Sequence, residues 1–428
     1  MREDVLQYIW QQQRFDKKCL TTSRKEALDI LSVGQLNHQA GPDFFNARIV
    51  IDGQEWAGTI EVHLKSSDWY AHGHEVDRNY DSVILHVVLV DDADIFRRDG
   101  SKVPTLALQA RISEALIASI EALFSNRKNA FINCAKDIGT IDTVFWRQWE
   151  ERLFVERLQA KSKVIEGLLN ETKNDWEAVL FFLLMKNFGL NKNGDAFLSI
   201  AKHIGFSTFK KVIQNPFSTE SLLLGVSGLL EDDDMLYEPY FKDLQKEYRF
   251  LVKKFQLSEY NGLRPVFFGL RPNNFPTIRL VQLAMLYAKQ GSLFQALMSA
   301  DSLNEYHNLF QITTSTFWET HYTFAKVSGK RVKKLTPAFV ELILINTVVP
   351  LKFSYQRTQG KEDIEALMDL NLKLPPEKNS IISGFEKLGA FSASAFESQA
   401  KIQLFNEYCT PNRCVNCQIG IRLLSGKN

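Results

Sequence analysis

The strongest constraint on the fold is a change in the pattern of apolar residues near residue 112. Before it, short apolar runs alternate with turn sequences; after it, apolar residues recur every three or four positions. The first pattern is typical of strands and the second of amphipathic helices. The sequence therefore predicts an α+β chain, with an α/β domain over residues 1–111 and a larger all-helical domain over residues 112–428.

The α/β domain is expected to begin with a helix over residues 3–14. The expected strands cover residues 27–33, 44–51, 56–64 and 83–90. Asp52-Gly53 predicts a hairpin between the second and third strands. The run VILHVVLV is apolar throughout, as in a strand that is covered on both faces. Another hairpin is expected at Asp99-Gly100, leading into residues 103–108.

The rest of the chain predicts helices and carries no fixed repeat. Apolar residues have helical spacing over residues 144–169, 176–188, 243–255, 278–287, 339–348 and 390–405. The loops between them contain Pro and Gly, as in the sequence LRPNNFP.

Composition excludes several classes of protein. The 428 residues are 45% hydrophobic, with 51 Lys+Arg and 50 Asp+Glu, so the chain is neither disordered nor basic throughout. The N-terminus is charged from its second residue, and no uncharged apolar run reaches about 18 residues, so we expect neither signal peptide nor membrane span. Five cysteines do not make a disulfide framework, so we expect a cytoplasmic protein with reduced thiols.

Histidine and negative charge are concentrated near the N-terminus. Residues 1–110 contain 12 Lys+Arg, 17 Asp+Glu and five of the eight histidines. Such a segment is suited to holding a cation, although uneven composition alone is the simpler explanation. Within it, Asp43 begins one strand, and Glu61, His63 and Lys65 alternate along the next. Residues two apart share a face of a strand, and a hairpin brings Asp43 beside Glu61, as an Mg²⁺ or Mn²⁺ site requires.

This arrangement resembles the PD-(D/E)XK nuclease superfamily, which has the restriction-endonuclease-like fold. The resemblance implies that Glu3, Asp43 and Glu61 bind the metal. It also implies that a Lys orients the attacking water. Here His63 stands where the superfamily has that Lys, and Lys65 follows two residues later. The catalytic base is then Lys65 or His63, or else the site is inactive.

A second resemblance covers nearly the whole chain. The stretches GPDFFNA, GTIEVHLKSSDWYAHGHEVDRNYDSVILHVV, LRPNNFPTIRLVQLA and YCTPNRCVNCQIG are similar to a bacterial family known only as a domain of unknown function. The resemblance implies that the run containing His72, His74, Asp77 and Tyr80 belongs to the pattern of that family.

His72 and His74 have three possible roles. With His63 and Asp77 they could ligate Zn²⁺ or Mn²⁺. Alternatively, they could contact a substrate phosphate, with Tyr80 nearby, or stabilise their loop by hydrogen bonds. His86 lies inside an apolar run and is expected to be a core histidine.

The cysteines form a second candidate metal site. Cys409, Cys414 and Cys417 lie within nine residues, and Cys134 is the obvious fourth ligand for Zn²⁺ or an iron–sulfur cluster. The set resembles the iron–sulfur staple of some PD-(D/E)XK nucleases, although its C-x4-C-x2-C spacing differs from their C-x2-C-x5-C. Free buried thiols are the alternative.

Three functions follow from these patterns. The leading hypothesis is a magnesium-dependent, nuclease-like hydrolase of phosphodiester bonds, with nucleic acid as its partner. The second is a nucleic-acid-binding or interaction module on a degenerate nuclease fold. The third is a His-centred metallohydrolase acting on another substrate. The run Lys330-Arg331 to Lys334 could contact phosphates, or simply be a solvated surface.

Overall fold

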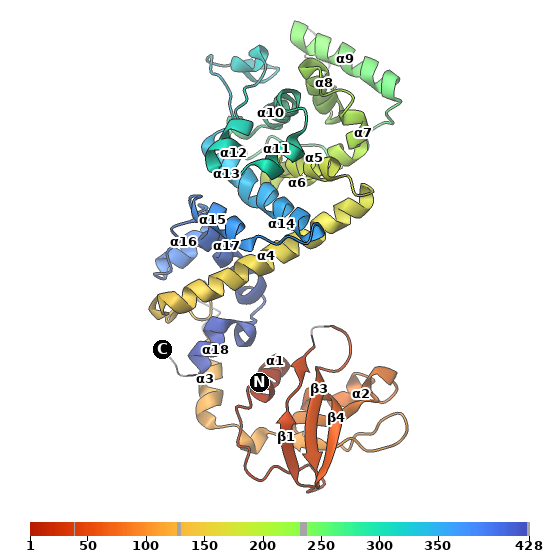
Figure 1. The fold of residues 1–428 in the computed structure, drawn as a ribbon, viewed down its shortest axis with the longest axis vertical. Helices are drawn as coiled ribbons and strands as arrows, with labels where there is room; N and C mark the ends of the chain where they lie inside the picture. Colours follow the sequence, from red (N-terminus) through yellow and green to blue (C-terminus); the bar gives the residue numbers. More distant parts are fainter. Residues whose placement is uncertain (38, 126–129, 232–237, 426–428) are drawn as a thin grey trace. The chain divides into compact units, whose positions relative to one another are not determined.

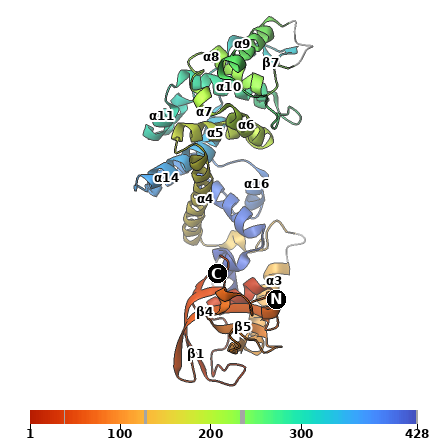
Figure 2. The same cartoon turned by 90° about the vertical axis from the view of Figure 1, so that its right-hand side faces the viewer.

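The computed structural model describes residues 1–37, 39–125, 130–231 and 238–425. Its packing divides the chain into two units. The sheet unit comprises residues 1–149, 383–390 and 404–428, and the helical unit residues 150–382 and 391–403. The strands of the large sheet occupy the red-to-orange part of the chain in Figures 1 and 2. The structure is thus of the mixed α+β class, with a larger helical part.

The packing division differs from the boundary expected at residue 111. Residues 112–149 and two later segments pack with the sheet instead of with the helical unit. The reason is a shared apolar core: Leu116 and Ile120 of α3 (Glu114–Ser125) and Leu424 of α18 (Gln418–Leu424) lie in the same cluster as the strand residues. Helical periodicity marks the type of an element but does not show which core it joins.

The sheet is mixed, with neighbours in the order β1-β3-β4-β5-β6 and β2 paired to β3. The strand bounds are β1 (Leu28–Ser32), β2 (Gln35–Leu36), β3 (Phe44–Ile51), β4 (Gln54–Lys65), β5 (Val83–Val90) and β6 (Thr105–Ala107). β3 is antiparallel to β1 and to β4, whereas β5 is parallel to both β4 and β6. The four expected strands correspond to β1, β3, β4 and β5.

The β3–β4 hairpin turns at the expected place. Asp52 and Gly53 both have positive φ, +48° and +83°, as a two-residue type I′ turn requires. The turn pairs Ile51 with Gln54 and leaves Phe44 opposite Ile60 at the other end. This register brings the start of β3 beside the middle of β4.

Helix α1 (Glu3–Gln11) is shorter than the expected helix over residues 3–14. It buries Val5, Leu6 and Ile9 in the core shared with the sheet. The chain leaves the helix at Gln13, whose φ is +49°. Glu3 and Gln7, one turn apart, occupy the same face of α1.

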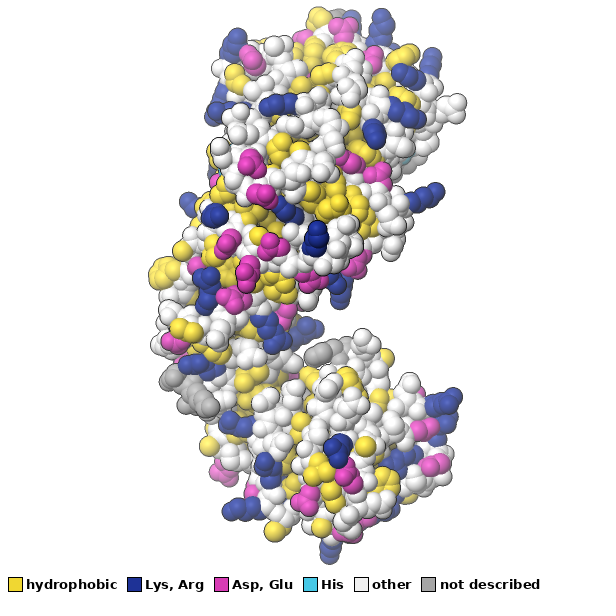
Figure 3. Space-filling model, viewed as in Figure 1, with side chains coloured by type: hydrophobic (Ala, Val, Ile, Leu, Met, Phe, Trp, Pro, Cys, Tyr) yellow, Lys and Arg dark blue, Asp and Glu magenta, His cyan; other side chains and the backbone are white. Residues whose placement is uncertain are grey.

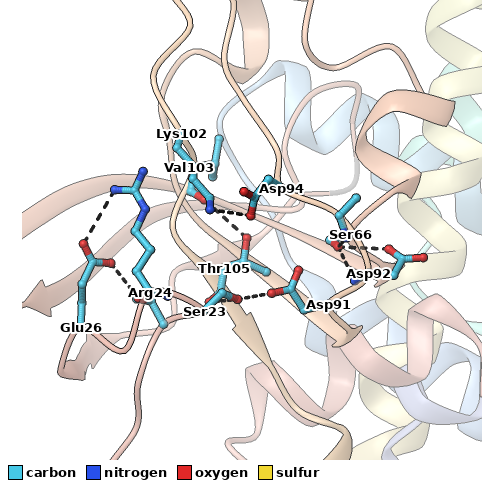
Figure 4. A network of polar contacts seen from close by, with 12 residues as sticks. Ser23, Arg24, Glu26, Ser66, Asp91, Asp92, Asp94, Lys102, Val103 and Thr105 are labelled. Carbon is cyan, nitrogen blue, oxygen red and sulfur yellow. Dashed lines mark hydrogen bonds and ion pairs between the residues drawn. The ribbon is translucent and has the colours of Figure 1, made fainter.

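Polar contacts join the segments that follow β4 and β5. The Ser66 hydroxyl donates to Asp92 Oδ1 (3.1 Å) and accepts from the Asp92 backbone N–H (2.8 Å). Ser23 donates to Asp91, and Lys102 forms an ion pair with Asp94 at 2.5 Å (Figure 4). Because β4 and β5 are parallel, the contacts between Ser66 and Asp92 hold together the same end of both strands.

The connection from β4 to β5 contains little regular structure. It consists of α2 (Asp68–Ala71), a short loop and a 3₁₀ turn (Arg78–Tyr80). Trp69 of α2 is fully buried, and its indole N–H donates to the Phe96 carbonyl (3.1 Å). The loop is therefore anchored to the sheet unit by a large side chain.

The helical unit is built around α5 and α10, which are largely buried. The helix bounds are α4 (Thr143–Glu171), α5 (Trp176–Phe188), α6 (Leu190–Ile204), α7 (Phe206–Phe209), α8 (Pro216–Val226), α9 (Pro239–Phe255), α10 (Pro276–Lys289), α11 (Leu293–Ser299), α12 (Leu303–Leu309), α13 (Pro337–Ile343), α14 (Val349–Thr358), α15 (Ile364–Leu372), α16 (Ser380–Lys387) and α17 (Ala395–Leu404). The division between the units falls inside α4 and inside α16.

Most helices expected in this region are present. α4, α5, α9 and α10 cover the expected ranges, and α13 continues as a π-helical turn (Leu344–Val348). The helix expected from residue 390 begins only at Ala395. A short hairpin, β7 (His321–Thr323) and β8 (Lys326–Val327), was not expected.

One long apolar helix and the distribution of surface charge bear on the environment of the protein. Among the described residues, one helical run, Pro337–Thr358, is long and apolar enough to cross a membrane. Its most apolar window is 67% buried inside the protein, which is consistent with a core helix of a soluble protein. On the face seen in Figure 3, Lys and Arg are interspersed with Asp and Glu.

Candidate metal centre

Asp43 and Glu61 are joined across the start of the β3–β4 pair. The Asp43 backbone N–H donates to Glu61 Oε2 (3.1 Å), and Asp43 Oδ2 accepts from the Val62 backbone N–H (3.0 Å). Each carboxylate thus accepts a hydrogen bond from the backbone of the segment that carries the other carboxylate. This leaves Glu61 Oε1 directed at another set of side chains.

Helix α1 supplies two polar side chains to the same place. Gln7 Nε2 donates to Asp43 Oδ1 at 2.9 Å. Burial raises the pKa of Glu3, and the nearby charges of Asp43 and His72 also act on it. Glu3 therefore lies beside the acidic pair. Gln7 was not identified from the sequence, although its position one turn after Glu3 was a usable signal.

Three imidazoles converge next to Glu61. One ligating atom from each of His63, His72 and His74 lies within 4.8 Å of the others. His72 Nδ1 is 3.0 Å from His63 Nε2. Glu61 Oε1 is 3.3 Å from His63 Nε2 and 3.4 Å from His74 Nε2. Three imidazole nitrogens therefore surround a common point, and Glu61 Oε1 borders two of them.

These separations match the edges of a small coordination polyhedron. Zn²⁺ binds nitrogen and oxygen at about 2.0–2.2 Å, so tetrahedral ligands lie about 3.3–3.5 Å apart. Glu61 with His63 and Glu61 with His74 fall in that range, and His63 with His72 is slightly shorter. The side-chain nitrogen His74 Nε2 is buried and has no hydrogen-bond partner among the described residues. A cation at the common point would satisfy it.

A glycine turn returns His72 and His74 to the sheet. α2 ends at His72, and Gly73 follows with φ +73°, a conformation that side chains rarely adopt. The His74 backbone N–H donates to the Trp69 carbonyl (3.0 Å), which closes the turn. His74 is buried and His72 exposed, so the cluster has one side open to solvent.

Other aromatic and imidazole rings pack against the histidines of the cluster. His63 Nδ1 is 2.9 Å from His86 Nε2, and both rings are buried. The Tyr80 ring stacks on His74 with centroids 3.7 Å apart, and the Trp69 ring meets the edge of both His74 and His86. His86 is a core histidine as expected, but it also orients a member of the cluster. The sequence alone did not indicate this second role.

Burial determines the charge of the cluster. It lowers the pKa of His63 to about 2 and that of His86 to about 3, with neighbouring histidines as the next cause. It raises the pKa of Asp43 to about 7, helped by the charge of Glu61, and that of Glu61 to about 8. His63 and His86 are therefore neutral at pH 7, and the neutral imidazole is the form that binds metals. The contact between His63 and Glu61 is accordingly not an ion pair.

Lys65 and Asp77, which the sequence suggested as a catalytic base and a metal ligand, have other contacts in the structure. Lys65 is exposed at the end of β4, and its charge lowers the pKa of Asp92, after the hydrogen bonds that Ser67 and Ser66 donate to Asp92. The Asp77 carboxylate accepts from the Asn79 backbone N–H and caps the 3₁₀ turn. Glu61 Oε1 is in direct contact with His74, whereas Asp77 acts on it through its charge, which opposes the lowering of the His74 pKa by burial.

The cysteines are placed at another part of the sheet unit. Cys134, Cys409, Cys414 and Cys417 are close enough for their charges to act on one another. Cys19 is exposed on the segment between α1 and β1.

Comparison with known proteins yields one match. No curated protein and no solved structure matches the chain. The matching family is described as a protein of unknown function, DUF2851, and the match covers residues 3–380. That range includes every residue of the histidine cluster but ends before Cys409. Because the match spans most of the sequence, the chain belongs to the DUF2851 family.

Proposed function

We propose that this protein is a metal-dependent hydrolase of phosphodiester bonds. Its ion is held by Glu61, His63, His72 and His74. The observation that carries the proposal is the convergence of three imidazoles, with a Glu61 carboxyl oxygen 3.3 Å and 3.4 Å from two of them, separations typical of ligands around one ion. A cluster of this kind is expensive to bury without a ligand, because His74 Nε2 lacks a hydrogen-bond partner among the described residues.

The donor atoms favour a transition metal over Mg²⁺. Mg²⁺ prefers six oxygen ligands, whereas imidazole suits Zn²⁺ and other first-row metals. The sequence had led us to expect Mg²⁺ or Mn²⁺ on Glu3, Asp43 and Glu61. The imidazoles support Zn²⁺ or Mn²⁺, with Glu61 as the shared ligand.

The surrounding side chains have positioning roles in this proposal. Asp43 holds Glu61 through its backbone N–H, and Gln7 holds Asp43. His86 holds the ring of His63. A metal ion held by Glu61, His63, His72 and His74 would supply Lewis acidity, which would polarise a phosphoryl oxygen and activate a nearby water. Substrate approaches from the exposed side, where His72, Glu3 and Tyr80 are accessible.

The choice of a phosphodiester as the substrate is based on the topology of the sheet. The antiparallel β1–β3–β4 set, the crossover to a parallel β5, and α1 ahead of them agree with the order that the PD-(D/E)XK resemblance implies. Asp43 precedes β3 and Glu61 lies on β4, as in that superfamily's motif. His63 takes the place of the motif's Lys and becomes a ligand in our proposal.

One observation favours a second function. His63 stands where the motif has its Lys, and Lys65 is exposed at the end of β4, where its charge acts on Asp92. A nuclease fold that has lost this Lys can serve as a nucleic-acid-binding module whose metal is structural. This alternative requires metal binding without turnover.

The test combines metal content with hydrolysis. Purified protein loaded with Zn²⁺, Mn²⁺ or Mg²⁺ is assayed on bis(p-nitrophenyl) phosphate and on single- and double-stranded DNA and RNA. His63→Ala and His74→Ala should lose the metal and the activity together. His307→Ala, in α12 of the helical unit, is the matched control and should retain both. Lys65→Ala should retain the metal.

Three outcomes are distinguishable. Metal-dependent cleavage that His74→Ala abolishes supports the hydrolase. Stoichiometric metal without cleavage of any of these substrates rejects the hydrolase and supports the binding module. If His63→Ala and His74→Ala bind as much metal as the wild type does, the metal centre itself is rejected.

A further inference from the structure

A groove of about 880 Å³ lies on the helical unit. Its walls come from α8, α10, α12 and the start of α13, and from the segments 311–313 and 334–335 that connect these helices. All of these elements lie within residues 150–382, so the groove belongs to one unit of the chain. Its volume is typical of small-molecule binding sites, which occupy about 300–1,000 Å³.

Aliphatic side chains form much of the wall. Met285 and Ala288 line the groove from α10, Leu335 from the segment before α13, and Val340 from α13 itself. Among the described lining residues, Phe310 is the only Phe, Tyr or Trp, and it is almost fully buried. A planar aromatic ligand gains most from stacking on exposed aromatic rings. The lining therefore favours a flexible aliphatic chain over a planar ring.

The basic run noted in the sequence divides beside this groove. Lys333 is buried, and its amine donates to the carbonyls of Trp318 and Glu319. Lys330 forms an ion pair with the Glu319 carboxylate at 3.5 Å. Lys334 is exposed and lines the groove. One ammonium group of the run is therefore presented to a ligand in the groove.

A second ammonium group belongs to the same part of the wall. Lys289 Nζ donates to the Gln311 carbonyl (2.7 Å), and Thr313, two residues later, pairs with Lys334 in an antiparallel bridge. Segment 311–313 thus contacts both lysines. An ammonium has three donors, so the contact with Gln311 leaves others on Lys289. No Asp or Glu is among the described lining residues, so the groove combines apolar walls with positive charge.

We propose that this groove binds an aliphatic carboxylate, which is the chemistry of a free fatty acid. The chain lies against Met285, Ala288 and Val340, and the carboxylate accepts hydrogen bonds from Lys289 and Lys334. Covering the chain removes apolar surface from water, and the carboxylate supplies the negative charge that the lining lacks. None of these residues belongs to the histidine cluster, so the inference stands whether or not the protein is a hydrolase.

The experiment measures binding of a fluorescent fatty acid, 11-(dansylamino)undecanoic acid, and its displacement by unlabelled competitors. We expect saturable binding at one site per chain. Decanoate should displace the probe, whereas decanol, which has the same chain without the charge, should compete about tenfold less well.

Two variants test the position of the site. Ala288→Phe fills the groove and should abolish probe binding, whereas Ala160→Phe, at an exposed position of α4, should not. Lys334→Gln should weaken decanoate binding by about tenfold, because one charged hydrogen bond is lost, and should leave decanol unaffected. Lys330→Gln is its control in the same basic run, because Lys330 pairs with Glu319.

Probe binding that Ala288→Phe removes, together with the preference for decanoate, supports the proposal. Thermal unfolding checks that each variant is folded, and Lys334→Gln changes an exposed side chain, so it gives an answer even if Ala288→Phe does not fold. The proposal is overturned if the wild type does not bind the probe, if folded Ala288→Phe binds it as tightly as the wild type, or if decanoate and decanol compete equally in the wild type.

Discussion

His63 Nδ1 lies 2.9 Å from His86 Nε2, and this contact connects the strand that carries the cluster to its parallel neighbour. When the Nδ1 of His63 carries the proton and donates it to His86, the Nε2 lone pair of His63 faces His72 and Glu61. In that tautomer the contact orients His63 so that its Nε2 can bind a metal. The first two predictions test this arrangement.

His86→Phe should weaken metal binding without removing a ligand. The Phe ring fills the same space but cannot hold His63, and loss of such a partner typically costs about 10–100-fold in metal affinity. Competition with a chromophoric chelator measures the affinity. His307→Phe is the control. An unchanged affinity in His86→Phe would show that packing alone orients His63.

Glu61→Gln and Asp43→Asn should differ in their effects on metal binding. Glu61→Gln removes the charge of a proposed ligand, so metal should be lost. Asp43→Asn keeps the backbone N–H that contacts Glu61, so metal should bind more weakly but with the same stoichiometry. Calorimetric titration with Zn²⁺ separates affinity from stoichiometry. If Asp43→Asn loses all metal while Glu61→Gln keeps it, the proposed roles are reversed.

Gly73→Ala should disturb the positions of His72 and His74. Its φ of +73° costs a residue with a Cβ about 1–2 kcal/mol, although no atom within 4 Å would clash. The strain should lower metal affinity more than it lowers the melting temperature. Gly53→Ala, in the β3–β4 turn, carries similar strain away from the cluster and serves as the control. Equal metal affinity in both variants would contradict the prediction.

Glu220, in the helical unit, should make stability depend on pH. It accepts hydrogen bonds from Tyr240, Trp318 and Ser315, yet burial raises its pKa above 4.5. A raised folded-state pKa means that its contribution is full below the unfolded pKa and is lost as pH rises through the folded pKa. Glu220→Gln, which stays neutral, should therefore gain stability relative to the wild type as pH rises. Urea unfolding from pH 4.5 to 8 measures this difference, and a difference that does not change with pH would refute it.

The buried pair of Lys401 and Glu150 should be sensitive to loss of one member. Their side chains are 3% and 8% exposed, and the two charged atoms lie 2.7 Å apart. Glu150→Ala should destabilise the helical unit by about 3–5 kcal/mol, because the ammonium loses its carboxylate. The double variant Glu150→Leu with Lys401→Met should recover most of this loss. Chemical unfolding of Glu150→Leu, Lys401→Met and their double variant forms the cycle, and additive losses would contradict the coupling.

Local sequence was enough to predict the main elements of the sheet unit. Asp52-Gly53 predicts its hairpin because two consecutive residues with positive φ are needed for a type I′ turn. The apolar run of β5 predicts a buried strand, and alternation along β4 places Glu61 and His63 on one face. These features depend on neighbours within a few residues, which the sequence displays directly.

The sequence by itself determined the α+β order, the hairpin that pairs Asp43 with Glu61, and the cysteine spacing. Only the tertiary structure placed His86 behind His63, Gln7 against Asp43, and Asn133 beside Cys414. It also joined the C-terminal segment to the sheet. The physical reason is that these contacts join residues far apart in sequence, through parallel strand pairing and shared apolar cores. Periodicity reports which face of an element is buried, but many partners can bury that face equally well.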